Sequence, residues 1–332
     1  MKCAVLPLDL TLKRDFIVAG GQASAKRNYL IIVDESGLGE AAGSVYYGAT
    51  PAEIESDILR LAAYWGGKTS VDDWDIPDDM ADSVCAPALC AASTARHDWI
   101  ARRKGIPLYR QLGIDPPQPV KTSLTISLGD IEALRGALLS GCEHIKIKMD
   151  SADIEKSPMI RIINESQRAV FRIDANGSWD RAISEKIMAR LSADKIELVE
   201  QPFVPDAVDS WHWWRDTMSV PVFMDESVQS SDDVERVAGY VDGVNIKIQK
   251  SGLLETAIEA MKTAHRLGLK VMLGCMVESS VGIAAAYHLS GLADYLDLDG
   301  RMLIESDPFT GLSYADGRIA VAGDKGHGVS FA

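Results

Sequence analysis

The sequence lacks several patterns that mark common classes of protein. Its five cysteines are scattered and form no Cys-x-x-Cys pair, which argues against a zinc finger or a dithiol redox site. Only 34 basic residues stand against 48 acidic ones, and no basic run could neutralise a phosphate backbone. We therefore expect no nucleic-acid partner, and the odd number of cysteines suits a reducing cytoplasm.

Long apolar runs are missing as well. The opening stretch MKCAVLPLDLTLKRDF has no continuous apolar segment of the kind found in a signal peptide. The alanine-rich segment 84–101 is interrupted by Pro87, Arg96 and Asp98, so it does not read as a membrane span. With 332 residues, 47% of them hydrophobic, the chain can still bury a large core, and we expect a cytoplasmic protein without a membrane span.

The first third of the chain has the pattern of a small α+β domain. Residues 2–34 are strand-like and are followed by turn residues, and a helix is expected to begin at Pro51. A longer helix is expected over 87–104, ending at Gly105. The proline-rich segment GIDPPQP at 113–119 then marks a change of rhythm, so we predict a domain boundary between residues 115 and 116.

Eight short apolar runs follow the boundary, and helix-like sequence comes after each of them except the last. Such alternation predicts a parallel α/β barrel with (β/α)7β topology over residues 116–304. Polar residues end nearly every run, at the edge where such barrels carry their catalytic residues. The runs are KTSLTISL, HIKIKMD, AVFRIDAN, KIELVEQP, PVFMDES, GVNIKIQK, KVMLGCM and YLDLDG.

Three acidic residues end three consecutive runs: Asp174, Glu200 and Asp225. Taken singly, each could be a solvated strand end or a helix N-cap. In register on adjacent strands they are expected to converge, and three hard oxygen ligands suit Mg²⁺ while leaving positions for a substrate carboxylate. The pattern therefore predicts a magnesium site.

Lysines stand on the second and sixth runs. Lys146 and Lys148 are two residues apart, so both side chains leave the same face of their strand. Lys247 is on the sixth run, which lies opposite the second in an eight-stranded barrel, so Lys148 and Lys247 are expected to face each other across the metal. A lysine near other cations or in an apolar wall can have a pKa lowered to about 7 or 8 and act as a base. The alternative is that these lysines only form salt bridges with the acids.

Five of these motifs together resemble the enolase superfamily, in its muconate-lactonizing subgroup: KIKMD, RIDANGSW, VEQPF, MDES and NIKIQKSG. Mandelate-racemase-like members place a histidine on the seventh strand, where this chain has GCMVESS. The resemblance implies one Mg²⁺ per subunit and a modified TIM barrel. It also implies that residues 1–115 form a capping domain, which residues 305–332 complete.

The last run ends in Asp297, Leu298 and Asp299, and this D-x-D resembles the dipeptide epimerases, whose paired acids hold the substrate's ammonium group. An ordinary acidic strand end is the alternative. The resemblance implies that Lys148 and Lys247 move the α-proton from opposite faces and that Lys146 helps the metal to stabilise an enolate. The expected reaction inverts the α-carbon of the C-terminal residue of a dipeptide, either L-Ala-D/L-Glu or another L-Ala-L-Xaa.

The other predicted site residues follow from the same resemblance. Gly20 stands near the position where an arginine is expected for a glutamate side chain, so the second residue of the dipeptide stays open. Lys26 or Arg27 could substitute for that arginine, or the pair Tyr46 and Tyr47 could equally favour an apolar or aromatic second residue. Phe16, Tyr46, Met276 and Glu278 are expected to contact the substrate, and Asn176, Glu226 and Lys250 to support the ligands and bases.

Two rival functions remain open at the level of sequence. A cycloisomerase or an o-succinylbenzoate-synthase-like lyase would use the same metal and lysines but not an ammonium site at Asp297 and Asp299. A non-catalytic scaffold protein would be expected to have lost some of the lysines and acids, all of which are present. The expected partner is a small-molecule dipeptide, and a homo-oligomer is possible.

Overall fold

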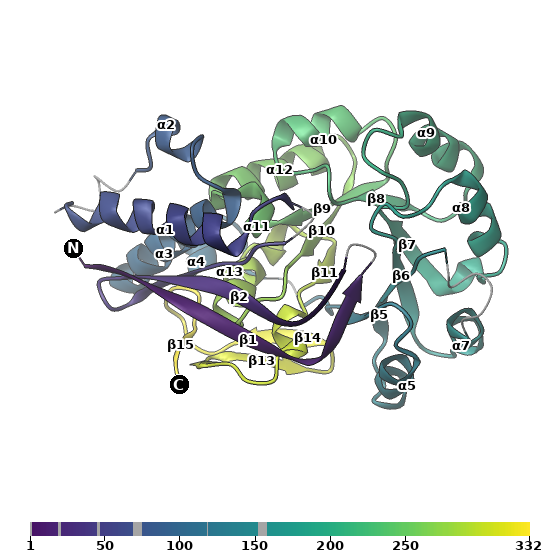
Figure 1. Cartoon of the computed structure of the whole chain (residues 1–332), viewed down its shortest axis with the longest axis horizontal. Helices are drawn as coiled ribbons and strands as arrows, with labels where there is room; N and C mark the ends of the chain where they lie inside the picture. The colour runs from purple at the N-terminus through teal and green to yellow at the C-terminus, as the bar shows by residue number, and fades with distance from the viewer. Residues whose placement is uncertain (1, 19–20, 45–46, 69–74, 118, 152–157) are drawn as a thin grey trace.

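The computed structural model describes residues 2–18, 21–44, 47–68, 75–117, 119–151 and 158–332. It begins with an antiparallel sheet of β1 (Cys3–Val18), β2 (Gly21–Val33) and β3 (Gly37–Ala41). Two long helices, α1 (Pro51–Gly66) and α3 (Ala86–Lys104), pack on this sheet, as Figure 1 shows at the purple end of the chain. The short helices α2 (Asp78–Ala81) and α4 (Leu108–Gln111) complete this part.

Small residues let α3 approach β3 closely. A Cβ atom added to Gly39 would lie 1.9 Å from the carbonyl oxygen of Ala91, and one added to Gly37 would lie 2.6 Å from that of Ala95. The atoms that these added Cβ atoms would meet are mostly backbone atoms of α3, so the helix backbone rests almost directly on the strand. This packing fixes the position of β3.

Eight parallel strands form the second part of the molecule. They run in the sheet order β11-β10-β9-β8-β7-β6-β5-β4, and a parallel bridge between Thr122 and Leu296 joins the two ends of the sheet. The predicted fold class is confirmed, since this is a closed barrel with a domain packed against it. The strands are β4 (Leu124–Ile126), β5 (His144–Lys148), β6 (Val170–Asp174), β7 (Ile196–Glu200), β8 (Val222–Met224), β9 (Gly243–Lys247), β10 (Lys270–Gly274) and β11 (Tyr295–Asp297).

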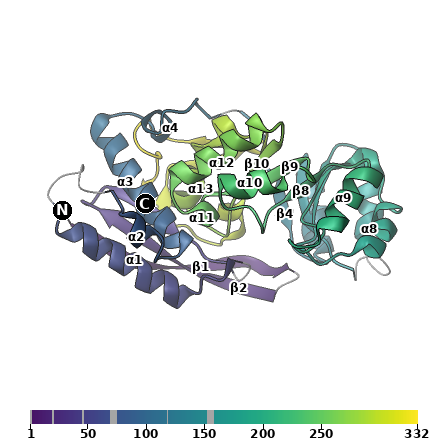
Figure 2. The ribbon, with the colours of Figure 1, turned by 90° about the horizontal axis from the view of Figure 1, so that it is seen from above.

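Helices separate the strands and cover the outside of the barrel (Figure 2). Both faces of each strand are therefore shielded from water, which is why the apolar runs are nearly continuous. The helices are α5 (Ile131–Leu139), α7 (Met159–Glu165), α8 (Arg181–Met188), α9 (Val208–Thr217), α10 (Ser231–Val237), α11 (Ile248–Ser251), α12 (Leu254–Arg266) and α13 (Ser280–Tyr287), with 3-10 turns η3 (Ala193–Lys195), η4 (Ser290–Leu292) and η5 (Gly300–Leu303).

The end of the chain returns to the first sheet. Phe309 and Val329 pack in one buried cluster with Leu30 and Leu38, which come from β2 and β3. The strands involved are β12 (Phe309–Thr310), β13 (Leu312–Ala315), β14 (Arg318–Val321) and β15 (Ser330–Phe331). The boundaries that we predict after residues 115 and 304 fall between regular elements and stay predictions. Over the described residues, no helix has the length and apolar character needed to cross a membrane.

Candidate active site

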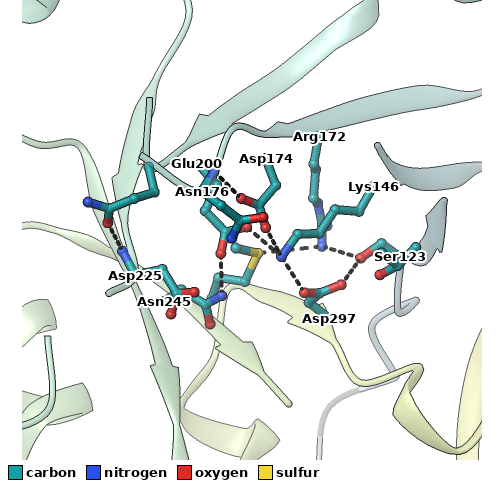
Figure 3. A network of polar contacts seen from close by, with 12 residues as sticks. Ser123, Lys146, Arg172, Asp174, Asn176, Glu200, Asp225, Asn245 and Asp297 are labelled. Atoms are coloured by element: carbon teal, nitrogen blue, oxygen red, sulfur yellow. Dashed lines mark hydrogen bonds and ion pairs between the residues drawn. The ribbon is translucent and has the colours of Figure 1, made fainter. Parts of the chain in front are cut away.

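The ammonium group of Lys146 lies at the centre of a buried charge network at the carboxyl ends of the barrel strands. Its Nζ atom lies 2.6 Å from Glu200 Oε2, 2.8 Å from Asp297 Oδ2 and 3.0 Å from Asp174 Oδ2. Figure 3 shows these carboxylates, carried by β6, β7 and β11, gathered around Lys146. The sequence prediction that acids on separate strands converge therefore holds for Asp174 and Glu200.

A second network surrounds Asp225, which directly follows β8. Lys247 Nζ is 2.7 Å from its Oδ2 atom, and the Tyr47 hydroxyl donates to the same oxygen at 3.0 Å. Lys250 donates to Oδ1 and to the backbone oxygen of Asp225, each at 2.6 Å, and to the backbone oxygen of Asn245 at 2.8 Å. Lys250, predicted only to support the site, thus contacts Asp225 directly.

Both candidate base lysines line a single cavity of about 340 Å³. Lys148 ends β5 and Lys247 ends β9, four strands apart in the eight-stranded order, so they approach the cavity from opposite sides. Lys148 Nζ lies 2.6 Å from Asp174 Oδ2. The cavity brings together most of the predicted site residues, since Phe16, Lys146, Asn176, Asp225, Met276, Asp297 and Asp299 line it as well.

Five predicted residues do not line this cavity: Asp174, Glu200, Glu226, Lys250 and Glu278. Glu278 is fully buried behind it, where its carboxylate accepts hydrogen bonds at 2.8 Å from the backbone N–H of Met276 and from Gln249 Nε2. Its position suits shaping of the loop that carries Met276, not contact with a ligand. Glu226 accepts a 3.0 Å hydrogen bond from Asn176 Nδ2. Tyr46 lies outside the described residues.

Burial and close spacing make the acids and lysines shift one another's pKa values strongly. Burial raises the pKa of Glu200, and the neighbouring charge of Asp174 adds to this, to about 7. Burial also opposes ionisation of Asp174, but Lys146 and Lys148 outweigh it and hold the pKa of that carboxyl at about 2. At neutral pH the network therefore keeps Asp174 charged and leaves Glu200 near its titration point.

The expectation of a lowered lysine pKa does not hold for Lys247. Burial alone would lower its pKa, but the adjacent carboxylate of Asp225 outweighs burial and raises the pKa instead. The physical reason is that the charged ammonium group of Lys247 is stabilised by the carboxylate of Asp225, 2.7 Å away. Lys247 can become a base only when another cation takes over as the counter-charge of Asp225.

The donor atoms of Asp174, Glu200 and Asp225 fit a hard divalent cation. All three carboxylates are buried, and Glu200 Oε2 accepts no well-directed hydrogen bond although Lys146 Nζ lies only 2.6 Å away. Among the described residues no group of three or more Asp, Glu, His or Cys stands in metal-binding geometry. Lysine ammonium groups supply positive charge to these acids: Lys146 contacts Asp174 and Glu200, and Lys247 and Lys250 contact Asp225.

Hydroxyl groups that the sequence analysis did not select position the D-x-D pair. Ser123 Oγ donates to Asp297 Oδ1 at 2.7 Å. Thr125 donates to Asp299 through its backbone N–H at 2.6 Å and its hydroxyl at 3.2 Å. A signal was present, because Ser123 and Thr125 are two residues apart on the first barrel run and share a face. Their partners are 174 residues away, so only the closed barrel reveals the contact.

Comparison with known proteins finds relatives that are named as dipeptide epimerases. The hydrophobic dipeptide epimerase of Roseobacter litoralis is 33% identical over 88% of this chain and 87% of its own. The L-Ala-D/L-Glu epimerase from Bacillus subtilis, solved as a substrate-liganded complex, superposes with a TM-score of 0.85 at 26% identity over 99% of each chain. The dipeptide epimerase from Enterococcus faecalis, complexed with Mg and L-Leu-L-Tyr, gives a TM-score of 0.88 at 25% identity, again over 99% of each chain.

The relatives are named as epimerases, and the chain is accordingly an enzyme of the isomerase class. Its sequence matches the family described as Enolase C-terminal domain-like over residues 130–332, which span seven of the eight barrel strands and the return segment. The chain therefore belongs to the enolase superfamily.

Proposed function

We propose that this protein is a Mg²⁺-dependent dipeptide epimerase, which inverts the α-carbon of the C-terminal residue of its substrate by 1,1-proton transfer. One observation carries the proposal: Lys148 and Lys247 line the same cavity from opposite sides, together with the acid pair Asp297 and Asp299. Two bases on opposite faces are what inversion at a carbon requires, because one removes a proton and the other returns one.

The acid pair supplies a site for the substrate's ammonium group. Burial raises the pKa of Asp299, and the neighbouring charge of Asp297 adds to this, to about 7. A cation placed between the two carboxylates would relieve their repulsion and satisfy both. Lys146 already pairs with Asp297, so an ammonium group bound here would mainly favour the ionised form of Asp299.

Asp174, Glu200 and Asp225 are the residues that would hold Mg²⁺. When bound, the ion supplies positive charge next to the substrate carboxylate and so favours loss of the α-proton. Lys148 and Lys247, released from Asp174 and Asp225, then exchange the proton from the two faces. Lys146 adds a positive charge beside the developing negative charge.

Deuterium incorporation at the α-carbon tests the proposal. The protein is incubated in D₂O with Mg²⁺ and a library of L,L-dipeptides that begin with L-Ala. We expect exchange with inversion on some members. NMR detects the exchange, and chiral analysis of the hydrolysed residue detects the inversion. Exchange on none of them, with Mg²⁺ binding shown separately, would exclude the epimerase and favour a cycloisomerase or lyase.

A further inference from the structure

One cation in the cavity wall has no role in the chemistry proposed above. Lys26 lies on β2, where it stands opposite Leu10 of β1, and it lines the same cavity as Lys148 and Lys247. Two residues on, Asn28 faces the same side of the strand and donates a 2.9 Å hydrogen bond to the backbone oxygen of Val277. This face of β2 therefore looks toward the mouth of the barrel.

Lys26 differs from the other lysines of the cavity in its partners. Lys146, Lys148 and Lys247 each lie within 3.0 Å of at least one carboxylate oxygen. For Lys26, no carboxylate of the described residues lies within 4.0 Å of the ammonium nitrogen. Its neighbour Arg27, on the opposite face, is already paired with Asp9 at 2.7 Å. Within the described part of the chain, Lys26 is thus a cavity cation without a carboxylate partner.

The surroundings of Lys26 indicate that a negatively charged ligand group would stabilise its ammonium group. The side chain is partly buried, and burial lowers the pKa of Lys26 with no carboxylate among the described residues to raise it again. The cavity is also lined by Phe16, Ala23 and Leu303, which pack against one apolar cluster that contains Leu10, the cross-strand neighbour of Lys26. An uncharged ligand would desolvate the ammonium group further without compensation, whereas a carboxylate would pair with it.

We propose that Lys26 pairs with an acidic side chain of the substrate, so that the enzyme prefers dipeptides carrying a glutamate- or aspartate-like residue over their neutral isosteres. This inference rests on the proposed epimerase function and names its substrate class. The apolar wall would contact the methylene groups of such a side chain, and Lys26 would bind its carboxylate. Lys26 acts here as a specificity-determining residue and takes no part in proton transfer.

Paired substrates that differ only in charge provide the test. With Mg²⁺ added, kcat/KM for epimerisation is measured for L-Ala-L-Glu against L-Ala-L-Gln, and for L-Glu-L-Ala against L-Gln-L-Ala. We expect the wild-type protein to prefer the acid by roughly tenfold or more in one of the two pairs, since a buried charge pair is lost with the amide. The responding pair also shows which substrate residue meets Lys26.

Three variants assign the preference to one side chain. Lys26→Met keeps the length of the stem and should reduce the acid-to-amide ratio to about one. Lys26→Glu should reverse it, favouring L-Ala-L-Lys over L-Ala-L-Met or the corresponding reversed pair. Arg27→Met removes a charge one residue along on the opposite face and should keep the wild-type ratio.

The outcomes separate this inference from the function on which it rests. Equal kcat/KM for acid and amide in both pairs, or an acid preference that persists in Lys26→Met, would overturn the role of Lys26. Turnover of L-Ala-L-Gln or L-Ala-L-Leu in that case would leave the epimerase intact with an apolar substrate class. Absence of α-proton exchange on every dipeptide would overturn both.

Discussion

At the scale of single residues, the site is a set of buried charges that depend on one another. Lys146 contacts three carboxylates and Asp225 is contacted by two lysines, all of them almost completely buried. Removing one member leaves an uncompensated buried charge, which costs more than the contact itself contributes. Single substitutions here should therefore affect folding as well as activity, and the two effects need separate measurements.

Lys250 offers a direct test of this dependence. Lys250→Met removes three hydrogen bonds, two of them to Asp225, and we expect the free energy of unfolding to fall by about 3–5 kcal/mol. Urea denaturation measures this change. Lys270→Met is the matched control, because Lys270 is an exposed lysine paired with Asp294 and its loss should cost no more than about 1 kcal/mol. Similar losses for the two variants would contradict the account.

Glu278 should give the protein a measurable pH dependence of stability. Burial raises its pKa, and the charge of Glu40 adds to this, to about 8, whereas the unfolded carboxyl titrates near 4.5. Because the folded state binds the proton more tightly, the contribution of Glu278 to stability is fully present below pH 4.5 and is lost as the pH rises to about 8. Glu278→Gln should therefore gain stability relative to the wild type between pH 5 and 9, measured by urea denaturation. A constant difference across that range would refute the assignment.

At the scale of secondary-structure elements, the sequence predicts the barrel strands closely. It does not predict which side chains from different elements form hydrogen bonds with each other. The runs carrying Lys148, Asp174, Glu200 and Lys247 form strands that end at these residues, because continuous apolar runs closed by a polar residue suit strands covered on both faces. The sequence could not predict that the side chain of Glu278 points away from the cavity. Its orientation depends on a hydrogen bond that it accepts from Gln249, which belongs to another βα unit.

The packing of α3 on β3 leads to a testable prediction at this scale. Gly39→Ala would place a methyl group 1.9 Å from Ala91 O and 2.8 Å from Ala95 N, so the helix must move, and we expect a loss of about 1–3 kcal/mol or more in the free energy of unfolding. Gly66→Ala, at the end of α1, meets no atom within 4 Å and should be neutral or slightly stabilising. Thermal unfolding of both variants distinguishes backbone contact from a general cost of alanine.

At the scale of the whole molecule, the cavity exists only where the two parts meet. Phe16 and Lys26 reach it from the first sheet, Tyr47 from the loop after β3, and Leu303 from the turn after β11. Gln249, on the barrel side, accepts a hydrogen bond from Ala42 N and donates one to Glu40 O, which ties the two parts together. Sequence patterns identify elements but not the contacts between distant ones. We expected Tyr47 only as part of the substrate pocket, whereas the structure also places its hydroxyl 3.0 Å from Asp225 Oδ2.

Metal binding should appear as a change in the stability of the whole molecule. Mg²⁺ that binds only the folded protein raises the midpoint of thermal unfolding, because at 100 times its Kd it stabilises by about 2.7 kcal/mol. We expect this rise in the wild type, its reversal by EDTA, and its loss in Asp225→Asn. Asp294→Asn, which changes an acid remote from the cavity, should keep the response. An equal rise in all three proteins would indicate a metal site elsewhere.

The most direct measurement of the central claim follows the two faces of the substrate separately. In D₂O with Mg²⁺, Lys148→Ala and Lys247→Ala are each given both diastereomers of a dipeptide that the wild type epimerises. We expect neither variant to interconvert the diastereomers, and each to retain α-proton exchange on a different one, because the remaining lysine serves one face only. Retention on the same diastereomer by both variants, or continued epimerisation by either, would contradict a mechanism with two opposed lysine bases.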